Sequence, residues 1–147
     1  WFNESVKLTK LWEAVVAFVK IESTLPFSAN ILFNDFEAVY NSHYLGRSFE
    51  GFVIEEIIKG LEATTVTNWS THYYRTRSGA EIDLILEGTF GTLPIEIKHQ
   101  RHTPLSQLKT LDMFITEHEL PFGVVVNYSN DITWLTKQIV QIPVGWL

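Results

Sequence analysis

The chain has 147 residues, of which 46% are hydrophobic and 14% aromatic, with a net charge of −6 and no cysteine. This composition excludes intrinsic disorder and any disulfide or cysteine-based metal framework, and it disfavours a broad basic surface for nucleic acid. The apolar runs are too short to cross a bilayer, and the absence of cysteine fits a reducing cytosol. We therefore expect a cytoplasmic protein with no membrane partner.

The first 45 residues predict a helical lead-in that continues a longer protein, because the chain begins with tryptophan and not with methionine. Within it, residues 6–22 place apolar side chains every three to four positions, which is the spacing of one helix face. We expect the principal domain to cover residues 46–147, a length that suits a single core.

Residues 49–61 predict the first helix of this domain, which ends at Gly60 or just after it. The pattern then changes to short alternating segments, which predict strands at residues 71–77, 80–87 and 92–99. Short, glycine-containing links join the consecutive strands. We therefore expect two antiparallel hairpins.

Thr103 and Pro104 predict the start of the next helix, with threonine as the N-cap and proline at the first helical position. Residues 121–128 then predict a buried strand, which a helical crossover would place parallel to the third strand. We expect the tail at residues 134–147 to add an edge strand. The order helix, three strands, helix, strand predicts an α/β fold in which helices enclose a mixed sheet.

Charged residues interrupt the apolar pattern of the second and third predicted strands. If residues 88–91 form a four-residue hairpin loop, Asp83 lies opposite Glu96 and Glu81 lies opposite Lys98. These four side chains then share one face of the sheet, because side chains alternate along a strand. The predicted core face consists of Ile82, Leu84, Leu86, Ile95 and Ile97.

The predicted register places Asp83 and Glu96 directly opposite each other, with their β-carbons roughly 5 Å apart. Two carboxylates in this arrangement destabilise a sheet unless a cation compensates. Glu50 lies in the apolar arc of the first helix, where a carboxylate needs a partner or must lose its charge. Carboxylate oxygens are the ligands that Mg²⁺ prefers. We therefore predict that Glu50, Asp83 and Glu96 hold Mg²⁺ or Mn²⁺. Lys98 would orient or deprotonate a water, or stabilise charge on a phosphate.

Each of these charges also has a purely structural interpretation. The strand charges form, in that case, a surface ladder of salt bridges in which Glu81 pairs with Lys98. Glu50 is then a buried glutamate that backbone groups or tyrosine hydroxyls satisfy. Arg75 and Arg77 either hold phosphate oxygens bidentately or are surface charges of a hairpin.

The spaced residues Glu50, Asp83 and Glu96-Ile97-Lys98 resemble the motif of the PD-(D/E)XK nucleases. The segments "GRSFEGFVIEEI", "YYRTRSGAEIDLIL" and "LPIEIKHQ" are similar to the nuclease-like domain at the C-terminus of many bacterial and archaeal AAA+ ATPases. The resemblance covers about residues 30–147 and implies a restriction-endonuclease-like core. It also implies that Asp83 and Glu96 are metal ligands, Lys98 is the catalytic lysine and Glu50 is the helix carboxylate.

These observations predict a Mg²⁺-dependent hydrolase that cleaves DNA phosphodiester bonds, with DNA and an upstream ATPase domain of the same polypeptide as partners. The alternative is a catalytically silent module of the same fold that serves the attached ATPase in docking or target sensing. The acidic set favours the nuclease, whereas the net negative charge and the missing basic groove favour the silent module. The chain has no Walker phosphate loop, so an ATPase would lie before Trp1.

Overall fold

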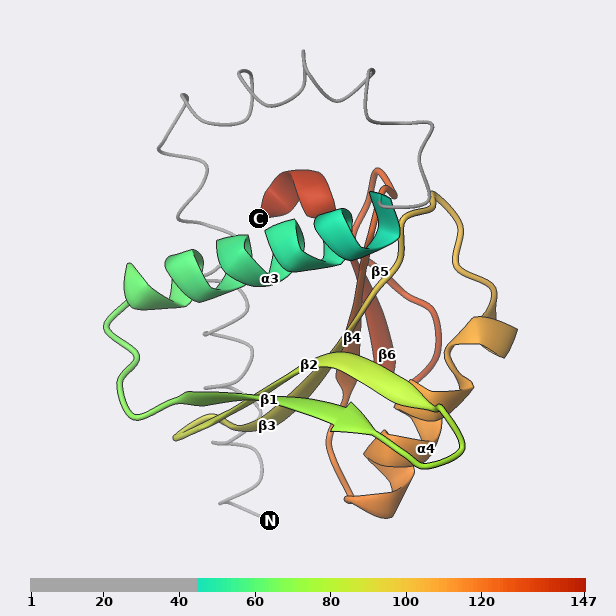
Figure 1. Cartoon of the computed structure of the whole chain (residues 1–147), viewed down its shortest axis with the longest axis horizontal. Helices are drawn as coiled ribbons and strands as arrows, with labels where there is room; N and C mark the ends of the chain where they lie inside the picture. Colours follow the sequence, from blue (N-terminus) through green and yellow to red (C-terminus); the bar gives the residue numbers. More distant parts are fainter. Residues whose placement is uncertain (1–44) are drawn as a thin grey trace.

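Residues 45–147 form a mixed sheet with one α-helix packed on each face (Figure 1). The structure is a computed structural model that describes these residues, and the helix predicted at residues 6–22 lies outside them. In chain order the elements are α3 (Leu45–Glu62), β1 (Ser70–Arg75), β2 (Glu81–Gly88), β3 (Gly91–Ile97), the 3₁₀ helix η2 (Leu105–Gln107), α4 (Lys109–Glu117), β4 (Gly123–Asn127), β5 (Thr133–Trp134), β6 (Ile139–Pro143) and the 3₁₀ helix η3 (Val144–Trp146).

The described strands lie in the order β1-β2-β3-β4-β6-β5. The two predicted hairpins are confirmed, because β1 with β2 and β2 with β3 are antiparallel. The predicted parallel pairing of β3 with β4 across a helix is also confirmed. The tail differs from the prediction, since it supplies two strands. β6 lies inside the sheet, parallel to β4, and only the two-residue β5 lies at the edge. All five residues of β6 are buried, as an interior strand requires.

The predicted register of the β2–β3 hairpin is confirmed, because Glu87 pairs with Thr92. The loop is shorter than predicted, since Gly88 and Gly91 pair with each other and leave a two-residue turn. Gly91 has a φ of 104°, a conformation that glycine adopts without strain. A Cβ at Gly88 would lie only 2.7 Å from the ring of Phe90, so the turn also needs a residue without a side chain there.

The pairing of β1 with β2 contains a β-bulge. One residue of β1, Tyr73, lies opposite two residues of β2, Asp83 and Leu84. The regular register resumes on both sides, where His72 pairs with Ile85 and Tyr74 pairs with Ile82. The extra residue is therefore located at Asp83 and Leu84, beside the predicted metal ligand.

The bulge changes which face of the sheet Ile82 covers. We predicted Ile82 on the same core face as Leu84 and Leu86, and this was wrong. Ile82 packs with Ile85 and Phe114 of α4, whereas Leu84 and Leu86 belong to the core beneath α3. The inserted residue shifts the alternation of side chains by one position.

Each α-helix buries one stripe of apolar side chains against its own face of the sheet. In α3 the stripe follows an i, i+4 spacing at Phe49, Val53, Ile57 and Leu61. On the opposite face, Leu108 and the α4 residues Leu111 and Ile115 pack against Val125 and Ile139. No helix within residues 45–147 has both the length and the apolar character needed to span a bilayer.

The segment before α4 does not follow the predicted cap. We predicted Thr103 as a helix N-cap and Pro104 as the first helical residue, but the chain first forms η2 and α4 begins only at Lys109. The Thr103 hydroxyl instead accepts a hydrogen bond from Asn127 at 3.0 Å. Leu105, the residue after Pro104, is 53% exposed in η2. A partner in a distant strand therefore replaces the local cap.

A substitution at Gly123 tests this packing. A Cβ at this buried position would lie 2.8 Å from Ile115 Cδ1 and 2.9 Å from Leu111 Cδ1, and both neighbours are fully buried. We expect Gly123→Ala to lower the free energy of unfolding by about 1–3 kcal/mol through overpacking. Urea unfolding measures this change.

Gly51→Ala provides the matched control, because a Cβ at this exposed position of α3 meets nothing within 4 Å. Alanine has the higher helix propensity, so this variant should be more stable by up to about 1 kcal/mol. Equal stability of the two variants would contradict the close approach of β4 to α4.

Candidate functional site

The candidate site lies where the β2–β3 ladder stops, after the pair formed by Leu84 and Ile95. The predicted backbone pair of Asp83 with Glu96 does not form. Asp83 Oδ2 instead accepts the N–H of Ile97 at 2.7 Å, so a side chain takes the place of a ladder hydrogen bond. This bond fixes the Asp83 carboxylate against the end of β3.

Glu96 is the buried acid of the site, with 5% of its surface exposed. Its Oε1 accepts a hydrogen bond from Lys98 Nζ at 2.5 Å. Its Oε2 is also buried and has no hydrogen-bond partner among the described residues. Burial and the neighbouring charge of Asp83 raise the pKa of Glu96 to about 7, against the opposing effect of Lys98. The site therefore contains a buried carboxylate whose negative charge is only partly balanced by Lys98.

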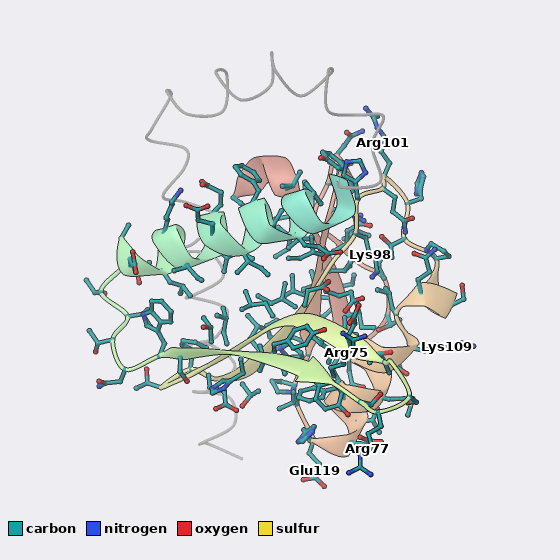
Figure 2. All side chains as sticks on the ribbon, viewed as in Figure 1. Arg75, Arg77, Lys98, Arg101, Lys109 and Glu119 are labelled. Carbon is teal, nitrogen blue, oxygen red and sulfur yellow. The ribbon has the colours of Figure 1, made fainter. Side chains whose placement is uncertain are left out.

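Lys98 follows β3 directly and is partly buried (Figure 2). Burial by itself lowers the pKa of Lys98, but the hydrogen bond to Glu96 and the charges of Glu96, Asp83 and Glu50 raise it above its ordinary value. The side chain is therefore an ammonium at neutral pH. The structural interpretation, in which Glu81 pairs with Lys98, does not hold in the structure, because Lys98 pairs with Glu96, two residues before it in the chain.

Glu50 comes from α3, one residue after the first member of the buried helix stripe, and it is half-buried. Its charge acts on Lys98, which places its carboxylate near the same ammonium. The structure thus brings the four predicted site residues to the same end of the sheet. The charge of Asp83 raises the pKa of Glu96, so these two carboxylates lie close to each other. The charge of Glu50 instead acts on Lys98, whose pKa it raises.

The predicted set of three metal ligands is not formed as a single group. Within residues 45–147, no three or more His, Cys, Asp or Glu side chains are arranged to hold a metal ion together. Asp83 and Glu96 each use one oxygen for a protein donor. These two acids remain the candidate ligands, because the second oxygen of Glu96 has no donor.

The charge of the site fits a divalent cation. The carboxylates of Glu50, Asp83 and Glu96 face one ammonium, that of Lys98, which leaves two net negative charges when all four groups are ionised. Burial raises the pKa of Asp83, although the Ile97 N–H and Lys98 oppose this effect. A divalent cation would neutralise the excess charge and satisfy the unpaired Glu96 oxygen, and Mg²⁺ accepts sites with few protein ligands.

Residues 45–147 match a family described as a domain of unknown function, DUF4143. The chain belongs to the DUF4143 family. No curated protein and no solved structure matches the chain. The matched range begins at the first residue of α3 and includes every described strand, so all the candidate site residues lie within the DUF4143 domain.

The DUF4143 domain contains a buried polar network beside the site that the sequence analysis missed. Asn127 is fully buried at the end of β4, and its Nδ2 donates to Thr103 Oγ1 at 3.0 Å and to Gln141 Oε1 at 2.9 Å. Its Oδ1 accepts the N–H of Ser129 at 3.0 Å. The network ties the end of β4 and the middle of β6 to the segment before α4. The only signal in the sequence is an asparagine that ends a run of valines.

An aromatic cluster anchors α3 to the same end of the sheet of the DUF4143 domain. The ring of Phe49 stacks on Tyr128, with centroids 4.8 Å apart, and meets His99 edge-on at 5.0 Å. His99 and Tyr128 also meet edge-on, at 5.1 Å. Phe49 precedes Glu50 and His99 follows Lys98, so this packing sets the distance between the helix carboxylate and the ammonium.

Proposed function

We propose that residues 45–147 form a divalent-cation-dependent, nuclease-like domain of the PD-(D/E)XK type that hydrolyses DNA phosphodiester bonds. The observation that carries this proposal is the buried carboxylate of Glu96. One of its oxygens has no hydrogen-bond partner in the described residues, and the charge of Asp83 lies beside it. A buried acid in this condition needs a proton or a cation.

Asp83 and Glu96 would hold Mg²⁺ or Mn²⁺, and Glu50 would complete the negative charge from the helix. When bound, the cation supplies a water of lowered pKa and neutralises charge on the phosphate. Lys98 keeps its proton at neutral pH, because carboxylates surround it. Its ammonium would stabilise the negative charge that develops on the phosphate or orient the water that attacks.

The order of elements supports the finer assignment to a restriction-endonuclease-like core. The element order is α3, the three antiparallel strands β1 to β3, α4 and β4, which is the order helix, three strands, helix, strand that the sequence predicted. In the full polypeptide, the domain would be the C-terminal part of an AAA+ ATPase. The ATPase would control when the domain meets DNA.

A catalytically silent module of the same fold is the second candidate. Two observations favour it, namely the absence of a three-ligand metal group within residues 45–147 and the net charge of −6 of the whole chain. Such a module would use the same surface for docking or target sensing by the attached ATPase. The two candidates differ in whether the site catalyses hydrolysis of DNA.

Calorimetric titration with Mn²⁺ tests the proposal first. We expect the wild-type protein to bind the cation and Asp83→Asn to lose at least about tenfold in affinity, because the substitution removes a ligand charge. Asparagine keeps an oxygen that can accept the Ile97 N–H, so the fold should survive. Asp131→Asn, at an exposed loop position, is the matched control and should bind like the wild type.

Cleavage of branched, single-stranded and duplex DNA with Mg²⁺ then tests turnover. The nuclease proposal requires at least one substrate to be cut by the wild type and not by Asp83→Asn. Cation binding without cleavage of any of the three would instead establish the silent module. The absence of both binding and cleavage would overturn the metal site altogether.

A further inference from the structure

An exposed tyrosine lies directly beside the candidate site. Tyr73 is 57% exposed on β1, which is an edge strand of the described sheet. It occupies the bulge opposite Asp83 and Leu84. Its hydroxyl donates a hydrogen bond to Glu81 Oε2 at 2.7 Å. A large aromatic ring is therefore held in a fixed place at the surface next to a predicted metal ligand.

An arginine shares the same anchor. Arg75 Nε lies 3.9 Å from the Glu81 oxygen that accepts the tyrosine hydroxyl, and the arginine side chain is 64% exposed. Tyr73 and Arg75 are two residues apart on one strand, so their side chains project from the same face. The two groups form a small surface unit, which we call the Tyr73–Arg75 pair.

This pair borders the carboxylates of the site. The charge of Glu81, which anchors the pair, contributes to the raised pKa of both Asp83 and Glu96. Figure 2 shows Arg75 on the same side of the molecule as Lys98, together with Arg77, Arg101 and Lys109. A polymeric substrate that reached the carboxylates from this side would pass the exposed ring of Tyr73 and the guanidinium of Arg75.

The chemistry of the pair suits an unpaired nucleotide. An exposed aromatic ring can stack on the face of any base, and a guanidinium can hold a phosphate with two hydrogen bonds. A base within a duplex is already stacked between its neighbours and cannot offer its face to a side chain. The net charge of −6 also argues against binding that rests only on phosphate contacts, which is the usual mode for duplex DNA.

We propose that Tyr73 stacks on an unpaired base and Arg75 holds an adjacent phosphate, so that the segment entering the site is single-stranded. This inference rests on the proposed nuclease function and names the form of its substrate. It assigns a binding role to two residues with largely exposed side chains.

Equilibrium binding of a fluorescent twelve-nucleotide deoxythymidine oligomer, with Ca²⁺ in place of Mg²⁺ to prevent cleavage, tests the inference. We expect the wild type to bind this strand more tightly than a duplex of the same length. Tyr73→Ala should weaken binding of the single strand by about tenfold. Tyr73→Phe keeps the ring and should retain most of the affinity.

The salt dependence separates the two roles. The slope of log K against log salt is negative. Arg75→Ala should make it shallower by about 0.7, the value expected for the loss of one phosphate contact on a single strand. Tyr73→Ala should leave this slope unchanged, because stacking releases no counterion. Trp134→Ala is the matched control, since this 50% exposed tryptophan lies on β5 at the opposite edge of the described sheet.

The inference is overturned if Tyr73→Ala binds the single strand like the wild type, or if the wild type prefers the duplex. This outcome is distinct from failure of the nuclease proposal, because the binding readout needs no turnover. A protein that cuts DNA but binds equally well without the ring loses only the inference. A protein that needs the ring to bind but cuts nothing loses only the nuclease.

Discussion

Replacing Lys98 by methionine should lower the rate of Mg²⁺-dependent DNA cleavage by about a hundredfold or more. The removal of one charged donor to a transition state has an effect of this size. Methionine has a similar length and lacks the ammonium, so the variant removes the charge with little change in volume. Single-turnover cleavage rates, measured with saturating protein, report the effect on the chemical step.

Cation binding by the Lys98→Met variant distinguishes catalysis from simple charge pairing. The three neighbouring carboxylates that raise the pKa of Lys98 lose their ammonium, so the site becomes more negative. Mn²⁺ affinity should therefore stay the same or increase while cleavage falls. Loss of both together would mean that Lys98 only holds Glu96 in place.

Lys59→Met is the matched control for this substitution. Lys59 is an exposed lysine of α3 that forms ion pairs with Glu55 at 2.9 Å and with Glu56 at 3.1 Å. Surface pairs of this kind contribute little to stability. The variant makes the same chemical change away from the site and should cleave like the wild type.

The sequence predicted the hairpin that carries the site because the information was local. Two glycines mark the β2–β3 turn, and apolar residues alternate along both strands, so the register of Glu87 with Thr92 followed directly. The same alternation was misleading one step further. Ile82 continues the pattern of Leu84 and Leu86, yet the bulge turns it to the other face. A bulge leaves no mark in a pattern that remains apolar at every second position.

Long-range partners explain the other differences. The pair Thr103-Pro104 is a strong local signal for a helix start, but the Thr103 hydroxyl bonds to Asn127, 24 positions away. The partner of Lys98 could not be read from the sequence either. Glu81 accepts a hydrogen bond from Tyr73, and Lys98 donates to Glu96. Sequence reasoning identified which residues gather at the end of the sheet. The structure was needed to show which of them pair.

Replacing Glu96 by glutamine should stabilise the protein at pH 8 in the presence of a chelator, with a gain of up to about 3 kcal/mol. The pKa of Glu96 rises from an ordinary 4.5 to about 7 because of burial and the charge of Asp83. The folded protein therefore binds a proton that the unfolded chain releases between these values. Stability of the wild type should fall as the pH rises from about 4.5 to 7 and then level off.

Urea unfolding between pH 4.5 and 8 measures this dependence. The Glu96→Gln variant carries no proton to lose at this position, so its curve should be flatter than that of the wild type, and the two curves should converge near pH 4.5. Glu87→Gln is the matched control, because the Glu87 side chain is 53% exposed and its removal changes charge without relieving burial. Its curve should run parallel to that of the wild type.

Mg²⁺ should reduce the stability advantage of Glu96→Gln over the wild type, and should reverse it at concentrations more than about a hundredfold above the dissociation constant. A cation that binds only the folded state stabilises it in proportion to the logarithm of its concentration above the dissociation constant. Wild-type protein at pH 8 should therefore gain stability with Mg²⁺, whereas Glu96→Gln, which lacks the ligand charge, should not. If the variant gains as much as the wild type, the cation binds elsewhere and the unsatisfied Glu96 oxygen is not its ligand. If neither protein gains, the buried acid is only a proton site and the proposed metal site is overturned.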